Sequence, residues 1–209
     1  MRVYKGRYLS VTSILALKDP FDKSSFINWC KKNGFDEVLV SNLSRVLGEK
    51  VSEYLNNIQQ GLESITAPLV DDLEVRLSGA VDDFVKEYKL ESTEQEVFCD
   101  KLHYAGRFDG IVSKNGQRYL VDWKTYGAWR STPYKRSSKK IRSAREQLSL
   151  YAYALGWKDK LGVVIFKNNG TWELEEVKFG SDIIKWVEDN QELICKTIQN
   201  ENKKHNKEN

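Results

Sequence analysis

Two aspartates and a lysine lie close together in the middle of the sequence, within short segments typical of β-strands. Asp109 lies in GRFDG, and Asp122 and Lys124 lie in LVDWKT. Leu120 and Val121 lead directly into Asp122, so this carboxylate stands where an apolar strand leaves the core. An acid in that place must be paired, protonated or bound to a cation.

The dipeptide Asn115-Gly116 between the two segments is a strong signal for a tight β-hairpin turn. It predicts that 106–113 and 117–125 are antiparallel neighbours. Counting outward from the turn, one residue on each strand at a time, places Asp109 opposite Asp122. The two carboxylates should therefore face each other across the hairpin.

Facing carboxylates repel each other unless a positive charge lies between them. Side chains two apart on a strand share a face, so Lys124 should lie beside Asp122, with Trp123 on the other side. A divalent cation between the carboxylates supplies the missing charge, and oxygen ligands favour Mg²⁺, with Mn²⁺ as its substitute. Such a metal lowers the pKa of a bound water and offsets charge on a phosphate, which is the chemistry of phosphodiester hydrolysis.

Two alternatives remain at this point. Lys124 could deprotonate the attacking water, or as an ammonium it could hold that water and stabilise charge. The whole group could also be two ordinary salt bridges, Asp122 with Lys124 and Asp109 with Arg107. That interpretation would be preferred for an isolated DxK triplet, and it loses weight because the hairpin and a downstream helix motif accompany the triplet.

The elements that must position these residues follow from apolar periodicity. The first half of the chain predicts helices over 23–32, 36–58 and a segment after Pro68. Short runs rich in branched and aromatic residues then predict strands over 94–100, 106–113 and 118–126. The remaining elements are a helix over 143–155, a hairpin around Asn168-Asn169-Gly170, and a helix capped by Ser181 that ends near residue 199.

This order of elements predicts a single α/β (α+β) domain over 1–199, with a central mixed sheet flanked by helices. Its helical N-terminal part covers about 10–90 and its catalytic core about 91–199. The polar segment 200–209 is predicted to be a disordered tail.

Composition narrows the metal chemistry and the location. The three cysteines (Cys30, Cys99 and Cys195) are scattered and the chain has 2 histidines, so a zinc site or an iron–sulfur cluster is not expected. No apolar run approaches the roughly 20 residues of a membrane span, and the start lacks a secretory signal. We therefore expect an intracellular, cytoplasmic protein without a membrane partner.

A basic stretch precedes the predicted helix at 143–155. Segment 134–145 contains basic residues and no acid: Lys135, Arg136, Lys139, Lys140, Arg142 and Arg145. Such a cluster can neutralise the phosphates of DNA, although a solvated loop explains it as well. The aromatic residues Tyr126, Trp129 and Tyr134 could stack on unpaired bases or pack in the core.

The succession GRFD, LVDWKT and QLSLYAYAL resembles the PD-(D/E)XK nucleases of the RecB-like branch, and is similar to phage exonucleases and the mitochondrial genome maintenance exonuclease. The resemblance covers about residues 10–179 and is strongest from 94 to 155. It implies a restriction-endonuclease-like core and Mg²⁺-dependent hydrolysis of DNA, in single strands or at ends. It favours an exonuclease over an endonuclease and suits a phage or virus protein acting in its host cell.

The resemblance also implies roles for single residues. Asp109 matches the acid of the "PD" motif, although Phe108 stands where the motif has proline. Asp122 and Lys124 match (D/E)xK, and the backbone carbonyl of Trp123 would be a further metal ligand. The remaining matches are Gln147 and Tyr151 of the QxxxY helix motif, which i, i+4 spacing places on one helix face, and Ser10 and Thr12 of an SVT element assigned to nucleic-acid binding.

One further acid completes the metal site in these families, and Glu94 or Glu96 could supply it. Glu94 is preferred for its distance to the GRFD motif. One departure is Ser52, which follows Gly48 where RecB-like members carry a histidine. This difference favours, mildly, an alternative in which the chain is a catalytically inactive nucleic-acid-binding protein; an enzyme acting on RNA is a third interpretation. Cleavage polarity, the number of metal ions and the oligomeric state are left open.

Overall fold

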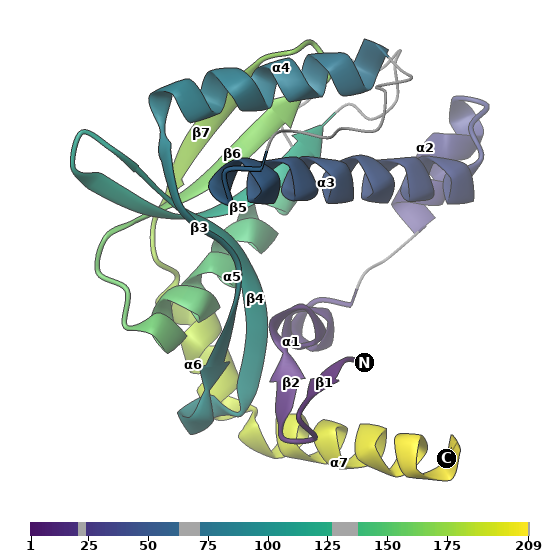
Figure 1. Cartoon of the computed structure of the whole chain (residues 1–209). Helices are drawn as coiled ribbons and strands as arrows, with labels where there is room; N and C mark the ends of the chain where they lie inside the picture. The colour runs from purple at the N-terminus through teal and green to yellow at the C-terminus, as the bar shows by residue number, and fades with distance from the viewer. Residues whose placement is uncertain (21–23, 63–71, 127–137, 209) are drawn as a thin grey trace.

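A mixed β-sheet forms the centre of the computed structural model, which describes residues 1–20, 24–62, 72–126 and 138–208 (Figure 1). Within these residues the strand order is β1-β2-β4-β5-β6-β7, with β3 paired to β4. The strands are β1 Val3–Tyr4, β2 Tyr8–Ser10, β3 Lys89–Cys99, β4 Tyr104–Lys114, β5 Gln117–Tyr126, β6 Lys160–Lys167 and β7 Trp172–Val177. Lys135, Arg136, Trp129 and Tyr134 lie outside the described residues.

Helices cover both faces of the sheet, as the resemblance implied (Figure 1). On one face α3 and α4 pack against β5 and β6, and on the other α5 covers the sheet with α1 and α6 beside it. The helices are α1 Val11–Lys18, α2 Ser24–Lys32, α3 Glu37–Gln59, α4 Asp72–Glu87, α5 Ser138–Leu155, α6 Ser181–Asp189 and α7 Gln191–Glu208, with a 3₁₀ turn at Asp100–Leu102. Among these helices none has the length and apolar character that a membrane span requires.

Alternate side chains of β5 belong to two separate cores. Leu120 and Tyr126 lie in the core beneath α5, whereas Val121 and Trp123 lie in the core beneath α3 and α4. In that second core Phe84 meets Trp123 edge-on at 5.9 Å between ring centroids. Because side chains alternate along a strand, Asp122 and Lys124 must face the α5 side.

The hairpin between β4 and β5 has the predicted register. Its pairs run from Lys114 with Gln117 to Gly110 with Val121, so the next position outward sets Asp109 opposite Asp122. The second predicted hairpin is also confirmed, since β6 and β7 pair antiparallel around the turn that contains Gly170.

The C-terminal prediction was wrong in three places, the first being that the single helix expected to end near residue 199 is divided at Asn190 into α6 and α7. Ser181 is the first residue of α6 rather than its cap, and Gly180 occupies the cap position without a side-chain hydrogen bond. The polar segment after residue 199 is not a disordered tail, because α7 continues to Glu208. Tertiary contacts account for the added turns: Glu201 accepts from the N-terminal amine at 3.0 Å, and Asn202 donates to the Gly6 carbonyl at 2.8 Å.

Helix α5 begins earlier than predicted, at Ser138 instead of about residue 143. Ile141 and Ala144 are buried in the same core as Leu148. Their spacing of three and four residues marks one helical face, which the surrounding basic residues hide in the sequence.

Gly110 permits close packing of β4 on the Trp123 indole. A Cβ atom at this position would lie 2.4 Å from Trp123 Cζ2, which is a severe overlap. We expect Gly110→Ala to destabilise the protein by roughly 1–3 kcal/mol, the usual range for overpacking. Urea unfolding of the purified variant measures this change.

Gly79→Ala is the matched control, because a Cβ there meets no atom within 4 Å and Gly79 lies inside α4. Helix propensity predicts that it stabilises the fold by up to about 1 kcal/mol. Equal effects of the two substitutions would contradict the packing argument.

Candidate active site

The candidate site lies in a gap along one edge of β4. One edge of this strand is occupied by β3, so β5 and β2 must share the other. On that shared edge β5 pairs with β4 as far as Gly110, and β2 pairs with Tyr104 and Ala105. Because β5 runs antiparallel and β2 parallel to β4, their carboxyl-terminal ends approach each other across the residues between, which include Asp109.

Asp109 holds the end of β5 through its side chain. Its Oδ2 accepts a hydrogen bond from the backbone N–H of Trp123 at 2.7 Å, in place of a regular ladder bond. The side-chain alternation of β4 also changes here, since Phe108 packs beneath α5 while Gly110 contacts Trp123 in the other core. This irregularity turns the Asp109 carboxylate into the gap.

Asp122 and Lys124 form the ion pair that both sequence interpretations required. Lys124 Nζ lies 2.5 Å from Asp122 Oδ2. Asp122 is 1% exposed, and among the described residues neither of its oxygens accepts a hydrogen bond of regular geometry. A buried carboxylate with so few donors is costly unless a cation is near.

The charged side chains of this site shift one another's pKa values. Burial and the charge of Asp122 raise the pKa of Asp109 to about 7, against the opposing effects of Lys124 and the Trp123 N–H. Burial by itself lowers the pKa of Lys124, but the charges of Asp122 and Asp109 outweigh it and leave the pKa above its ordinary value. The two carboxylates are thus close enough to repel, and Lys124 is held as an ammonium.

Glu94 approaches the pair from β3 and Glu96 does not. The backbone of Glu94 has φ 52°, a left-handed conformation uncommon for a residue with a side chain, and its charge raises the pKa of Asp109. Strained positions of this kind often accompany functional sites. Glu96 pairs in register with Arg107 and is exposed, so the structure favours Glu94 of the two candidates.

The third carboxylate is nevertheless not assembled with the other two. Arg107 Nε lies 2.6 Å from Glu94 Oε2, so Arg107 pairs with Glu94 rather than with Asp109. Within the described ranges no three His, Cys, Asp or Glu side chains converge closely enough to form a metal cluster. Glu94 is thus held near the carboxylate pair by Arg107, and its role as a third metal ligand stays a prediction.

The pair itself fits a divalent cation with oxygen ligands. Among the described residues Asp122 offers buried oxygens without regular donors, and Asp109 binds the Trp123 N–H through Oδ2. The N–H and C=O of one strand residue point to the same edge, so the Trp123 carbonyl lies on the Asp109 side. One or two carboxylates completed by water and substrate oxygens are characteristic of Mg²⁺ sites.

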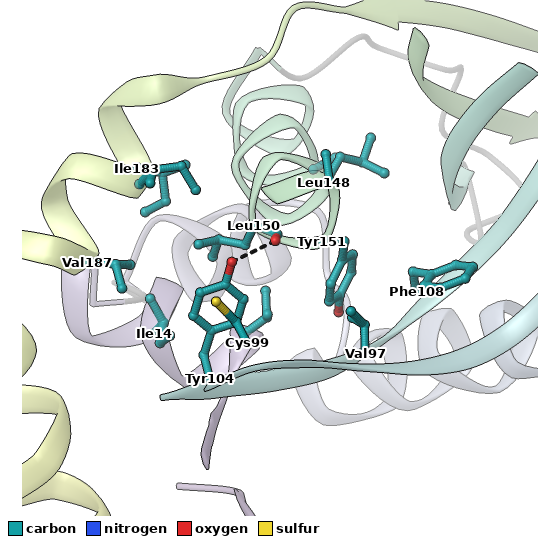
Figure 2. Packing of buried hydrophobic residues seen from close by; sticks show 14 of the residues in the cluster. Ile14, Val97, Cys99, Tyr104, Phe108, Leu148, Leu150, Tyr151, Ile183 and Val187 are labelled. Carbon is teal, nitrogen blue, oxygen red and sulfur yellow. Dashed lines mark hydrogen bonds between the residues drawn. The ribbon is translucent and has the colours of Figure 1, made fainter. Parts of the chain in front are cut away.

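Tyr151 of α5 lies near the carboxylates and contacts Gln147, the other residue of the helix motif. Gln147 Nε2 donates to Tyr151 Oη at 3.3 Å. Burial raises the pKa of Tyr151 and the charges of Asp109 and Asp122 add to this, so the phenol lies near both acids. Figure 2 shows the Tyr151 ring pointing from α5 toward the sheet beside Phe108.

Gly106 makes this position of Tyr151 possible, because a Cβ there would lie 2.6 Å from Tyr151 Cε1. The two glycines of GRFDG therefore have separate packing functions. Gly106 admits Tyr151 beneath α5, and Gly110 admits Trp123 on the other face.

The SVT element begins at the same gap, and its two polar residues have different environments. Ser10 is 3% exposed and caps α1, where its Oγ accepts from the Ser13 N–H at 3.0 Å. Ser10 is thus a structural cap, and its assignment to nucleic-acid contact stays a prediction. Thr12 is exposed and lines a pocket of about 650 Å³ between α1 and α5.

The basic residues of α5 that the structure describes also have different environments. Lys139 and Arg142 line the pocket with Thr12 and Gln147. Arg145 instead binds Asp182 at 3.0 Å and anchors α6, and its role in nucleic-acid binding stays a prediction. Lys140 lies apart from them, with its ammonium over a ring of β5.

Two residues that sequence reasoning missed join α1 to α5. Glu146 is 5% exposed and accepts from Lys18 Nζ at 2.6 Å, with Arg142 Nε at 3.3 Å. The i, i+4 spacing of Arg142 and Glu146 is visible in the sequence, but the pairing with Lys18 joins elements 128 positions apart. This ion pair holds one wall of the pocket beside Gln147.

Helix α3, which carries Ser52 where the family's histidine was expected, packs on the face of the sheet opposite Asp122 and Lys124. A Cβ at Gly48 would lie 3.9 Å from Thr125 Oγ1, one residue beyond Lys124. Ser52 lies one turn further along α3 and is half-buried.

One family of known proteins matches most of this chain. A sequence model described as the PD-(D/E)XK nuclease superfamily matches residues 35–204. The comparison with curated proteins gives no match.

Two solved structures have a similar chain course. LHK-Exo in complex with dAMP matches with a TM-score of 0.48 and 10% identity, over 97% of this chain and 93% of that chain. An alkaline exonuclease (LHK-Exo) from Laribacter hongkongensis matches with a TM-score of 0.43 and 11% identity, over 77% of this chain and 83% of that chain. These similarities are too low to transfer a residue's role.

The raised pKa of Asp109 predicts a pH dependence of stability in a metal chelator. Between its ordinary pKa of 3.8 and about 7, the folded protein holds a proton that the unfolded chain has released. Stability from this group therefore falls as pH rises through that window. We expect Asp109→Asn to raise the melting temperature relative to wild type at pH 8, with the difference shrinking toward pH 4. A difference that is independent of pH would contradict the assignment.

Proposed function

We propose that this chain, which belongs to the PD-(D/E)XK nuclease superfamily, is a divalent-metal-dependent deoxyribonuclease. Its substrate would be single-stranded DNA or DNA ends, cut as an exonuclease. The observation that carries the proposal is the pair of half-buried Asp109 and buried Asp122 with Lys124, placed at the gap between β5 and β2.

The protein's own groups account for the parts that phosphodiester hydrolysis needs. Asp109, Asp122 and the Trp123 carbonyl would hold Mg²⁺, or Mn²⁺ in its place, with Glu94 available from β3. When bound, this cation supplies Lewis-acid chemistry, in that it acidifies water and offsets charge on the phosphate. Asp109 is fixed for this purpose by the Trp123 N–H at 2.7 Å, so little reorganisation is required.

Lys124 is suited to binding oxygen rather than to accepting a proton. The raised pKa keeps the side chain an ammonium at neutral pH. An ammonium carries three donors and no acceptor, so it can hold the attacking water or a phosphate oxygen. Of the two roles open in the sequence, we propose this one.

DNA is the proposed substrate because Lys139, Arg142 and the motif residue Gln147 border one pocket, whose lining also holds the acids Asp19 and Glu146. Lys139 and Arg142 line the pocket of about 650 Å³ that also contains Gln147, so cations and the motif residue of α5 border one space. Phosphate neutralisation by such side chains supplies most of the sequence-independent affinity for nucleic acid. The preference for single strands or ends, and for exonuclease action, rests on the resemblance of the motifs to RecB-like exonucleases.

The decisive test incubates the chain with end-labelled single- and double-stranded DNA, and with RNA, in Mg²⁺, Mn²⁺ or chelator. We expect metal-dependent loss of DNA, with products that shorten from an end. Asp122→Ala should abolish it, and Glu94→Ala should reduce it, whereas Glu96→Ala, on the same strand but exposed, should not. DNA binding without cleavage in any metal would support the inactive alternative, and cleavage of RNA alone would redirect the substrate.

Removal of Lys124 separates a catalytic from a structural lysine. Lys124→Ala keeps both carboxylates, so Mn²⁺ should bind at least as tightly once a neighbouring cation is gone. Turnover should fall by roughly 10²–10⁴-fold, as expected for a positioned acid–base or charge-stabilising group. Metal affinity, melting temperature and cleavage are measured on one preparation. Preserved turnover together with a lowered melting temperature would show that Lys124 only pairs with Asp122.

Salt dependence tests the basic pocket. Lys139→Ala should flatten the log–log dependence of single-stranded DNA affinity on salt by about 0.7 per lost phosphate contact. Lys86→Ala is the matched control, since Lys86 is exposed on α4, across the sheet from α5. Equal slopes in wild type and Lys139→Ala would mean that this lysine is merely solvated.

A further inference from the structure

The hairpin formed by β1 and β2 places aromatic rings beside the start of β4 (Figure 1). Val3 and Leu9 pack in the core beneath α5. Because side chains alternate along a strand, Tyr4 and Tyr8 lie on the other face of the sheet. There they meet Phe98 of β3, at 6.3 Å and 5.3 Å between ring centroids. These three half-buried rings form an aromatic patch.

The helices around this end of the sheet use the opposite face. Helices α1, α5 and α7 contribute buried residues to the core that contains Leu9. On the other side of the sheet α3 meets β3 further along, where Asn56 accepts from the Thr93 hydroxyl at 2.8 Å. In the part of the chain that the structure describes, the aromatic patch therefore stays partly open to solvent.

Exposed cations lie on the rings of the aromatic patch. Arg2 Cζ is 4.5 Å from the centroid of the Tyr4 ring, and Lys5 Nζ is 4.3 Å from that of Phe98. Arg7 is exposed in the turn of the same hairpin. A cation over an exposed ring is a weaker contact than a nucleobase stacked on it. A base can therefore take the ring face while the displaced cation turns to a phosphate.

The charge of the hairpin suits an anionic strand. The first 18 residues of the chain contain no acid. Asp100 lies beside the aromatic patch and accepts a hydrogen bond from the Tyr8 hydroxyl. Glu96 is an exposed acid two residues from Phe98 on β3. The three cations of the hairpin thus outweigh these two acids.

The aromatic patch lies on a line that leads along β4 to the candidate site. Phe98 pairs in register with Ala105, so the rings cover the first part of this strand. Arg107 follows two residues later and is exposed, and Asp109 comes two residues after it. Four strand residues span about 13 Å, so a nucleotide chain bound on the rings can extend past Arg107 to Asp109.

We propose that the aromatic patch and the cations Arg2, Lys5 and Arg7 bind unpaired nucleotides of the substrate strand and guide it to Asp109. This inference rests on the proposed function and makes single-stranded DNA the form that the site receives. Bases stack on Tyr4 and Phe98, and the cations neutralise phosphates. In a duplex each base is already stacked and paired, so the rings favour single strands over double strands.

The experiment measures the affinity of the full chain for a labelled single-stranded oligonucleotide and for its duplex, in a metal chelator. Tyr4→Leu and Phe98→Leu keep an apolar side chain and remove the flat ring. We expect each to weaken single-strand affinity by about tenfold, from the loss of one stacked base, with little change for the duplex. Arg2→Gln should instead flatten the log–log salt dependence by about 0.7, as for one lost phosphate contact.

Trp157→Leu is the matched control. Trp157 is also half-buried beneath a cation, with Arg118 Cζ 4.8 Å from the centroid of its ring. Arg118 pairs with Ser113 beside the turn between β4 and β5, so this ring lies at the opposite end of β4 from the aromatic patch. Trp157→Leu should bind single-stranded DNA as the wild type does.

The outcomes separate this inference from the proposed function. It is overturned if Tyr4→Leu and Phe98→Leu bind single strands as the wild type does, or lose as much affinity for the duplex. If the ring variants have a lowered melting temperature, Arg2→Gln and Lys5→Gln decide, because they alter only exposed side chains; unchanged salt slopes in both overturn the inference. Intact single-strand binding by a wild type that cleaves in no metal would refute the nuclease function and leave the binding surface supported.

Discussion

The repulsion between a buried carboxylate, Asp122, and a half-buried one, Asp109, is the constraint on which the site depends. Asp109 and Asp122 come from neighbouring strands, and their proximity raises the pKa of Asp109 to about 7. Lys124 offsets part of this charge at 2.5 Å from Asp122. Packing on both faces of the sheet keeps the carboxylates together despite their repulsion, and the result is a preformed place for a cation.

The interrupted edge of β4 allows the chain to keep this arrangement. Because β5 leaves β4 after Gly110 and β2 joins it only at Ala105, the backbone between them is open to side chains instead of a strand. Asp109 satisfies the Trp123 N–H from this gap, and Tyr151 packs on Gly106 within it. Helix α1 starts where β2 ends, so the SVT element reaches the same place by topology.

The lysines of β5 and α5 differ in their surroundings more than their spacing in the sequence suggests. Lys124 is paired on the strand itself, and Lys140 lies over Tyr126, while Lys139 lines the pocket between α1 and α5. Arg145, from the same basic stretch, anchors α6 through Asp182. Basic residues that are close together in the sequence therefore have different roles in the fold, because successive helix residues point in different directions.

Local rules determined the parts of this protein that depend on near neighbours. The Asn115-Gly116 turn set the register that brings Asp109 to Asp122, and strand alternation placed Lys124 beside it, since both follow from the chain's own geometry. The tertiary structure alone decided that Glu94 pairs with Arg107, that Glu146 receives Lys18, and that residues after 199 continue a helix. Those outcomes depend on which distant segments meet, and sequence spacing carries no information about such encounters.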